Sequence, residues 1–149
     1  MVFLDFQLAF DVVDYEVLGR KLAARGCPAG LLHLLRGLCF EGLRSRLLIN
    51  GQVTDWFPRS CGVLQGSPLS PWLFNLFMDD LLAEVNARFL GVPICLFYAD
   101  DGILVTPAGM DVRGLLGVVE DWSRRNGLPL NVGKCAVLTG GADLPRLLL

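Results

Sequence analysis

The chain has 149 residues, of which 53% are hydrophobic and 19% charged, and its formal net charge at pH 7 is −2. Its length suits one domain, and its hydrophobic content excludes intrinsic disorder. The slight acidity argues against a protein that coats nucleic acid by charge alone. An enzyme acting on nucleic acid remains compatible with it, because bound cations can supply positive charge.

The N-terminal half of the sequence predicts a strand, two helices and a hairpin. Residues 2–6, VFLDF, form an apolar run around one acid, which is typical of a buried strand. Residues 14–25 predict a helix that begins at an N-capping aspartate, and residues 29–40 predict a second helix. In residues 43–57, Asn50-Gly51 supplies the positive φ angles that a tight hairpin turn needs.

The C-terminal half predicts two further helices and more strands. Ser67 is expected to cap a mostly apolar helix over residues 68–85. Residues 94–106 predict a hairpin, 111–126 an amphipathic helix, and 128–139 a last strand or pair of strands. Because strands and helices mix and two hairpins occur, we expect an α+β fold with an antiparallel sheet and helices packed on one face.

The sequence predicts neither a membrane span nor a disulfide framework. No stretch reaches the ~18 uncharged apolar residues of a spanning helix, and the acidic, non-basic start is unlike a signal peptide. The five cysteines are odd in number and show no C-x-x-C spacing, which favours neither disulfides nor a zinc site. We therefore expect an intracellular protein in a reducing compartment.

Three aspartates stand where the neighbouring residues are apolar. Asp5 lies within the first predicted strand, and Asp100 and Asp101 lie at the tip of the second hairpin. Burying an unpaired carboxylate costs several kcal/mol or more. Since no Lys or Arg lies inside these strands, hard cations such as Mg²⁺ are the best partners. Two such ions about 3.5–4 Å apart serve nucleotidyl transfer.

Simpler interpretations stay open for the acidic pairs. Asp-Asp-Gly at residues 100–102 also fits an ordinary hairpin turn, whereas turn chemistry does not explain Asp5. A second pair, Asp79-Asp80, falls on a predicted helix and is interpreted as a solvated face or local ion pairing.

Four segments together resemble the reverse transcriptases. FYADD, at residues 97–101, resembles their Y-x-D-D motif. FLDFQLAFDVVD, at 3–14, resembles the first palm motif of non-LTR retrotransposon and group II intron enzymes. GVLQGSPLSPWLFNLFMDDL, at 62–81, resembles the second palm motif, and WSRRNGLPLNVGKC, at 122–135, resembles the stretch after the catalytic hairpin. The ordered set looks most like non-LTR, LINE-type elements, with group II introns second.

The resemblance implies a polymerase palm with RNA-directed DNA polymerase activity. Asp5 and Asp100 would be the main ligands of two Mg²⁺ ions, with Asp101 beside them and Mn²⁺ as the alternative metal. These three aspartates would be both catalytic and metal-binding. The implied partners are an RNA template, a DNA primer and deoxynucleoside triphosphates.

The resemblance also assigns residues around the incoming nucleotide. Phe10 would lie under the sugar and exclude a 2′-hydroxyl, although a core aromatic is its plainer interpretation. Gln65 and Gly66 would border the same nucleotide, where glycine permits close approach and the amide both donates and accepts hydrogen bonds. Without the resemblance, these two residues read as an ordinary loop before a helix.

Five further residues complete the implied nucleotide site. Tyr98 and Ala99 would lie by the primer end or the nucleotide, and Lys134 would approach the triphosphate. The backbone amides of Leu8 and Ala9 would cradle phosphate oxygens. The plainer alternatives are a half-buried strand aromatic for Tyr98 and a surface lysine for Lys134.

The sequence departs from the family pattern at several points. Leu8 replaces a common lysine, Tyr15 a frequent histidine, and Leu64 a proline or arginine. The upstream fingers and the thumb are missing, so we expect a partial palm with part of the fingers over residues 1–139, followed by a frayed tail over 140–149. The alternatives are an inert retroelement remnant and another palm-like catalyst, such as a nucleotide cyclase.

Overall fold

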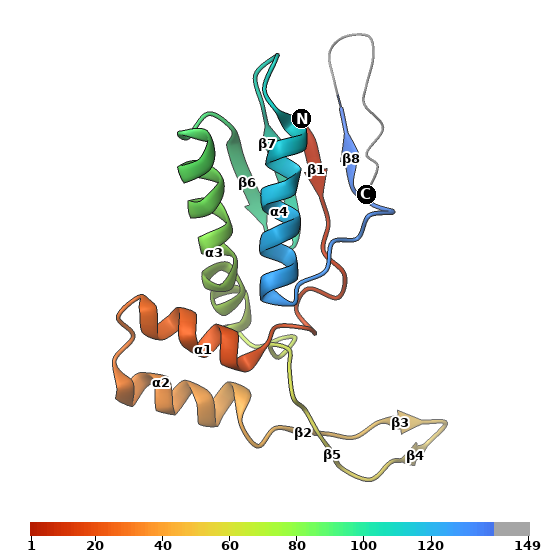
Figure 1. The fold of residues 1–149 in the computed structure, drawn as a ribbon. Coiled ribbons are helices and arrows are strands. Elements are labelled where there is room, and N and C mark those ends of the chain that lie inside the picture. The colour runs from red at the N-terminus through yellow and green to blue at the C-terminus, as the bar shows by residue number, and fades with distance from the viewer. Residues whose placement is uncertain (139–149) are drawn as a thin grey trace.

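A computed structural model describes residues 1–138, and the expected tail lies outside these described residues. Its centre is a four-stranded antiparallel sheet in the order β6-β7-β1-β8 (Figure 1). Two long helices, α3 and α4, cover one face of this sheet. The α+β expectation, with helices on one face, is therefore confirmed. The strands are β1 (Val2–Leu4), β6 (Ile94–Tyr98), β7 (Asp101–Val105) and β8 (Ala136–Val137).

Two of the helices begin at the capping aspartates that the sequence predicted. Asp14 accepts a 2.8 Å hydrogen bond from the Val17 amide at the start of α1, and Asp111 accepts one of 2.9 Å from the Gly114 amide at the start of α4. Gly127, with φ 65°, ends α4. The helices are α1 (Tyr15–Ala24), α2 (Ala29–Leu35), its continuation as a π-helix, η1 (Arg36–Phe40), α3 (Ser70–Phe89) and α4 (Val112–Asn126).

The start of α3 differs from the prediction. The helix begins at Ser70, with Pro71 in its first turn, and not at Pro68. The Ser67 hydroxyl accepts a 3.3 Å hydrogen bond from the Leu69 amide, so it closes a local turn before the helix instead of capping it. The Ser70 hydroxyl donates a 2.5 Å hydrogen bond back to the Leu64 carbonyl and holds this loop against the helix.

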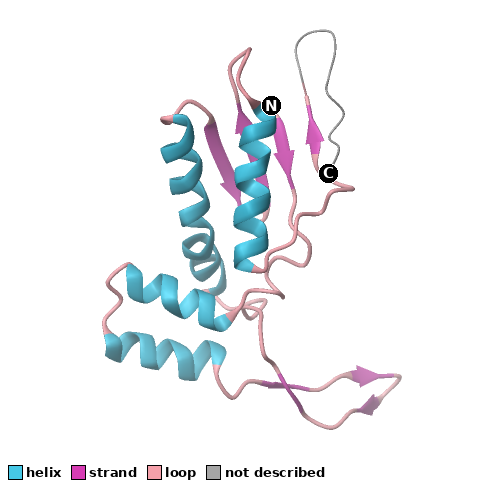
Figure 2. Cartoon of the chain, viewed as in Figure 1, coloured by secondary structure: helices cyan, strands magenta, loops and turns pink. Residues whose placement is uncertain are grey.

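A narrow hairpin arm projects from the body between η1 and α3 (Figure 2). The predicted turn is confirmed, because Asn50 and Gly51 have φ angles of 50° and 79°. Leu48 and Trp56 on the arm are 72% and 52% exposed. The arm comprises β2 (Arg44–Ser45) paired with β5 (Phe57–Pro58), and β3 (Leu48–Ile49) paired with β4 (Gln52–Val53).

The core lies between the sheet and the two covering helices. Trp122 of α4 is fully buried, and its ring meets Phe77 of α3 and Phe6 edge-on, with centroids 6.0 and 6.2 Å apart. The alternation along β1 and β7 sends Val2, Leu4 and Leu104 into the same core. No helix within residues 1–138 is long and apolar enough to cross a membrane.

Candidate functional site

Two aspartates directly follow the last paired residues at one end of the β1–β7 strand pair. Leu4 of β1 pairs with Gly102 of β7, and Asp5 and Asp101 are the next residues along the two antiparallel strands. This register brings two distant parts of the sequence together. Leu4 and Gly102 are buried beneath the helices. Since side chains alternate along a strand, Asp5 and Asp101 belong to the face of the sheet opposite the helices, where Asp101 is exposed and Asp5 is largely covered.

The turn of the β6–β7 hairpin lies one residue earlier in the sequence than a turn that begins at Asp100 would. Tyr98 pairs with Asp101, so the two turn residues are Ala99 and Asp100. Ala99 has φ 55°, a left-handed conformation that is strained for a residue other than glycine. Gly102 lies inside β7 and not in the turn, so turn chemistry does not explain it.

Tyr98 is an exposed aromatic residue next to this turn. Its side chain is 86% exposed, which excludes the half-buried strand aromatic of the plainer interpretation. It shares the face opposite the helices with its cross-strand partner Asp101. An exposed ring beside acidic residues offers a stacking surface for a base or a sugar.

Asp5 has an environment that suits a cation. It directly follows β1, and its side chain is only 16% exposed. Its Oδ2 lies 3.5 Å from the Nζ of Lys134, whereas its Oδ1 is buried without a hydrogen-bond partner. Burying a carboxylate oxygen without a partner costs free energy, so this oxygen is well suited to coordinate a hard metal ion. The sequence pattern does not reveal the Lys134 contact, because that lysine lies on a distant loop.

The metal site itself is not formed by side chains in the described part of the chain. Residues 1–138 contain no group of three or more His, Cys, Asp and Glu side chains that could hold a metal ion. In this arrangement the nearest charged partner of Asp5 is Lys134. The metal set of Asp5, Asp100 and Asp101 therefore stays a prediction.

One cavity is lined by three of the residues that the resemblance assigns to the nucleotide. Its volume is about 410 Å³. The Phe10 ring stacks on the buried Phe74 ring, with centroids 4.6 Å and planes 16° apart, so Phe10 is anchored in the core and also borders the cavity. Gly66 has φ 84°, which favours glycine. The lining residues are Phe10, Gln65, Gly66, Ser67, Pro68, Ser70 and Pro71.

The segment between Asp5 and Phe10 makes a tight turn. Leu8 has φ 48° and is 70% exposed, and its carbonyl accepts a 2.7 Å hydrogen bond from the Asp11 amide. Ala9 is 3% exposed and packs into the core. The turn therefore exposes Leu8 to solvent.

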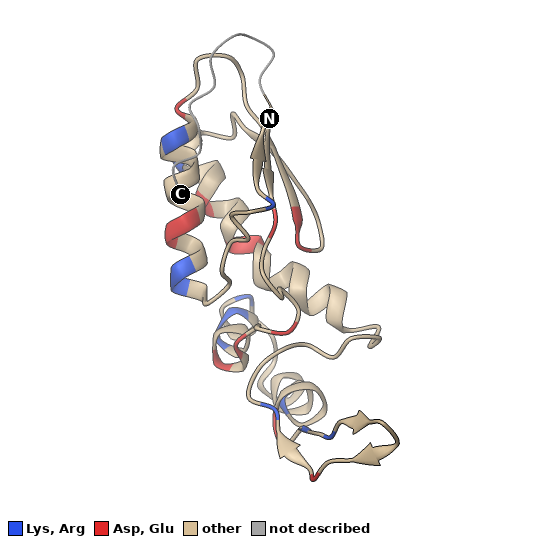
Figure 3. Cartoon of the chain, turned by 90° about the vertical axis from the view of Figure 1, so that its right-hand side faces the viewer, with Lys and Arg blue, Asp and Glu red and all other residues tan. Residues whose placement is uncertain are grey.

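The second acidic pair has a structural role. Asp79 pairs with Arg25 of α1, and Asp80 pairs with Lys21 at 2.8 Å. Both basic partners lie on α1, far from this pair in the sequence, so the expected local ion pairing is wrong, whereas Asp79 keeps the expected solvated position with its side chain 59% exposed. Elsewhere in the described residues, acidic and basic positions alternate along α4 (Figure 3).

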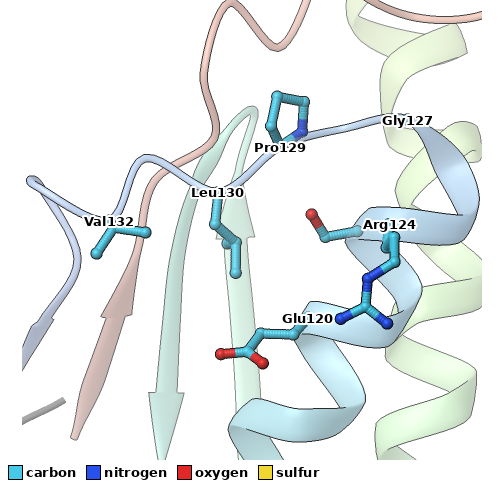
Figure 4. A pocket seen from close by; sticks show the side chains of 7 residues that line it. Glu120, Arg124, Gly127, Pro129, Leu130 and Val132 are labelled. Carbon is cyan, nitrogen blue, oxygen red and sulfur yellow. The ribbon is translucent and has the colours of Figure 1, made fainter. Parts of the chain in front are cut away.

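A further cavity, of about 490 Å³, contains none of the predicted site residues. It lies between α4 and the segment that follows it (Figure 4). Glu120 and Arg124 border it from the helix, and Pro129, Leu130 and Val132 border it from the loop.

Comparison with known proteins identifies the family. A model of the reverse transcriptase (RNA-dependent DNA polymerase) family matches residues 1–144. The chain belongs to this family.

The related reverse transcriptases come from non-LTR retrotransposons, as the motifs predicted. The Pol polyprotein of type-1 element R2 from Popillia japonica is 31% identical and aligns over 98% of this chain and 26% of its own length. That of element R2DM from Drosophila melanogaster is 34% identical over 89% of this chain and 13% of its own. The RNA-directed DNA polymerase of mobile element jockey from Drosophila funebris is 29% identical over 92% and 16%. The chain thus spans about a quarter or less of these relatives.

Solved telomerases share the fold of this reverse transcriptase chain. Telomerase from Candida albicans, in complex with a fragment of telomeric RNA, has a TM-score of 0.78 at 15% identity over 97% of this chain and 27% of its own. Apo telomerase from Candida tropicalis, truncated from its C-terminal domain, has a TM-score of 0.74 at 18% identity over 95% and 31%.

Proposed function

We propose that this chain is the palm part of an RNA-directed DNA polymerase, which adds deoxynucleotides to the 3′ end of a primer paired with an RNA template. The proposal rests above all on the register of β1 and β7, in which Leu4 pairs with Gly102 and the next residues along the two strands are Asp5 and Asp101. The cavity of Phe10, Gln65 and Gly66 supports it, because the family motifs assign these three residues independently to the incoming nucleotide.

Each group has a defined role in this proposal. Asp5, Asp100 and Asp101 would hold two Mg²⁺ ions, which when bound lower the pKa of the attacking hydroxyl and steady the leaving pyrophosphate. Lys134 would approach the triphosphate from its present place beside Asp5. Tyr98 would contact the primer end or the nucleotide, supported by its 86% exposure.

Phe10 and Gln65 would select and orient the sugar. The Phe10 ring stacks on Phe74, which limits its movement. A 2′-hydroxyl would therefore clash with the ring. The chain itself should extend a DNA primer on an RNA template with Mg²⁺. The same activity is expected of a chimera, the R2 polyprotein of Popillia japonica in which this chain replaces the matching segment. Phe10→Val should increase ribonucleotide incorporation about tenfold or more, because it opens the space beside the sugar.

The same assay decides against an inert remnant. Leu8, which is 70% exposed and stands where the motif that the chain resembles commonly has a lysine, is the observation that favours the remnant. Absence of extension in both settings would contradict the polymerase proposal, provided that the unmodified R2 polyprotein is active. Formation of a cyclic nucleotide without primer would point to the cyclase alternative.

A further inference from the structure

We propose that Asp11 is a positioning residue that fixes which end of the Gln65 amide faces the cavity. This inference rests on the proposed polymerase function and extends it. The family motifs assign no role to Asp11. It lies one residue beyond Phe10 and is exposed, so neither its hydrophobic surroundings nor its spacing single it out.

The contact between the two side chains has a defined direction. The Nε2 of Gln65 lies 3.3 Å from one carboxylate oxygen of Asp11 and 3.4 Å from the other. An ionised carboxylate can only accept hydrogen bonds. The amide must therefore turn its NH₂ group toward Asp11, and its carbonyl oxygen is left to accept hydrogen bonds from a ligand in the cavity.

The backbone holds Asp11 near Gln65. The Val63 amide donates a 2.8 Å hydrogen bond to the Phe10 carbonyl, and the Gly62 amide donates one of the same length to the Val13 carbonyl. These two bonds tie the segment before α1 to the loop before α3.

Gly62 permits this close approach. A Cβ atom there would lie 2.6 Å from the Asp11 carbonyl oxygen, a distance that real contacts do not reach. Gly62 also has φ 88°, in the region that favours glycine. The glycine therefore keeps the Asp11 and Gln65 segments in register.

The oriented carbonyl predicts a hydrogen-bond donor on the ligand. A deoxynucleotide sugar offers one hydroxyl donor, at its 3′ position, and Gln65 shares its cavity with the proposed sugar-contacting Phe10. A Gln65 amide locked by Asp11 would favour a nucleotide that carries this hydroxyl over one that lacks it. An unlocked amide could present its NH₂ group instead and would lose part of that preference.

Single substitutions separate the acceptor role of Asp11 from its charge. Asn keeps an acceptor oxygen, whereas Leu has a similar size and none. In the R2 polyprotein carrying this chain, Asp11→Leu should raise KM for deoxynucleotides and reduce the preference over dideoxynucleotides, each about 3–10-fold, as expected for one hydrogen bond. Asp11→Asn should stay within about threefold of the parent. Asp121→Leu, which removes an exposed carboxylate on α4, is the matched control.

A paired substitution guards against a simple folding defect. Gln65→Met should lose the same preference for the 3′-hydroxyl, and Asp11→Leu combined with Gln65→Met should be no worse than Gln65→Met alone. Equal losses in Asp11→Asn and Asp11→Leu would overturn the inference, since charge and not amide orientation would then be responsible. Additive losses in the double variant would overturn it as well.

A spectroscopic measurement tests the inference without catalysis. In ¹⁵N-labelled chain, the Gln65 side-chain NH₂ signals, assigned by their loss in Gln65→Glu, should lie at different chemical shifts in the parent chain and in Asp11→Leu. In Asp11→Asn, which keeps an acceptor oxygen, they should stay closer to the parent positions than in Asp11→Leu. If the parent polyprotein is inactive, the proposed function fails while this measurement still decides the role of Asp11. Gln65 signals at the same positions in the parent chain and in Asp11→Leu would refute the pairing.

Discussion

Lys21 donates a 2.8 Å hydrogen bond to Asp80, and this ion pair joins α1 to α3 inside the protein. Lys21 is only 9% exposed, and it also donates a 2.6 Å hydrogen bond to the Phe77 carbonyl. Asp80 accepts a further 2.9 Å hydrogen bond from the indole nitrogen of Trp122 on α4. One charged network therefore connects three helices beneath the sheet that carries the candidate site.

Removing the Lys21 side chain should destabilise the chain. Lys21→Ala loses two hydrogen bonds, the contacts of the ammonium with the Phe77 and Trp122 rings, and buried packing, so we expect a loss of about 2–4 kcal/mol in the free energy of unfolding. Lys21→Met keeps most of the packing and should lose about half as much. Urea unfolding measures both, with the exposed Arg20→Met as a control within about 0.5 kcal/mol of the parent.

The same lysine should make stability depend on alkaline pH. Burial lowers the pKa of Lys21 below its ordinary 10.5, and the hydrogen bond to Asp80 only partly offsets this. The folded chain therefore releases this proton at a lower pH than the unfolded chain does. Between the lowered pKa and 10.5 the unfolded state holds more protons, so this group makes stability rise with pH.

Comparison of the parent chain with Lys21→Met isolates that contribution. The difference in unfolding free energy between them should shift in favour of the parent as the pH rises from 8 to about 10.5. Other titrating groups, such as Tyr15, are common to both proteins and cancel. A difference that is flat over this range would contradict the proposed burial of a charged lysine.

Gly102 is required by its neighbour Phe97. A Cβ atom at Gly102 would lie 2.5 Å from the Phe97 ring, directly across the β6–β7 pair. Gly102→Ala should therefore lower the free energy of unfolding by about 1–3 kcal/mol through overpacking. Adding Phe97→Leu should recover part of that loss, and the double-mutant cycle should show a coupling above about 0.5 kcal/mol.

A helical glycine provides the contrast. Gly117 on α4 has open space where a Cβ would stand, so Gly117→Ala should be neutral or stabilise by up to about 1 kcal/mol. Equal destabilisation at both glycines would indicate a general loss of stability and not the specific contact with Phe97.

The sequence was most informative where local chemistry decides structure. Asp14 and Asp111 cap helices, and Asn50-Gly51 turns a hairpin, because each interaction spans only a few residues. The predicted start of α3 was wrong because Ser67 closes a competing local turn, and the choice depends on the hydrogen bond of Ser70 to Leu64.

Long-range pairing explains what the sequence alone could not predict. The Asp5–Lys134 contact and the Asp11–Gln65 contact each join residues that meet only when the sheet and the loop before α3 are assembled. Neither periodicity nor capping signals encode such contacts. The motifs supplied candidates for the site, whereas the register of β1 and β7 supplied their relative position.

Restoring the family lysine at position 8 should strengthen nucleotide binding. Leu8 is 70% exposed on the turn that precedes Phe10, so a lysine there would meet little steric obstruction. In the R2 polyprotein carrying this chain, Leu8→Lys should lower KM for deoxynucleotides severalfold, with a gain that shrinks as salt rises. Leu8→Met, which adds no charge, is the control. An equal effect of both substitutions would exclude electrostatic attraction as its cause.

We expect the Asp5 carboxylate to bind metal and to lower the stability of the metal-free chain. Its Oδ1 is buried without a partner, so in metal-free solution Asp5→Asn should leave the chain as stable as the parent, or more stable by up to about 1 kcal/mol. The lost pairing with the exposed Lys134 matters little.

Saturating Mg²⁺ should stabilise the parent, by about 2.7 kcal/mol at a hundredfold excess over Kd, and should not stabilise Asp5→Asn. Primer extension should fall about 10³-fold in that variant. Asp55→Asn, on the exposed arm, should keep both the metal response and the activity. An Mg²⁺ response that survives Asp5→Asn would show that the ion binds elsewhere.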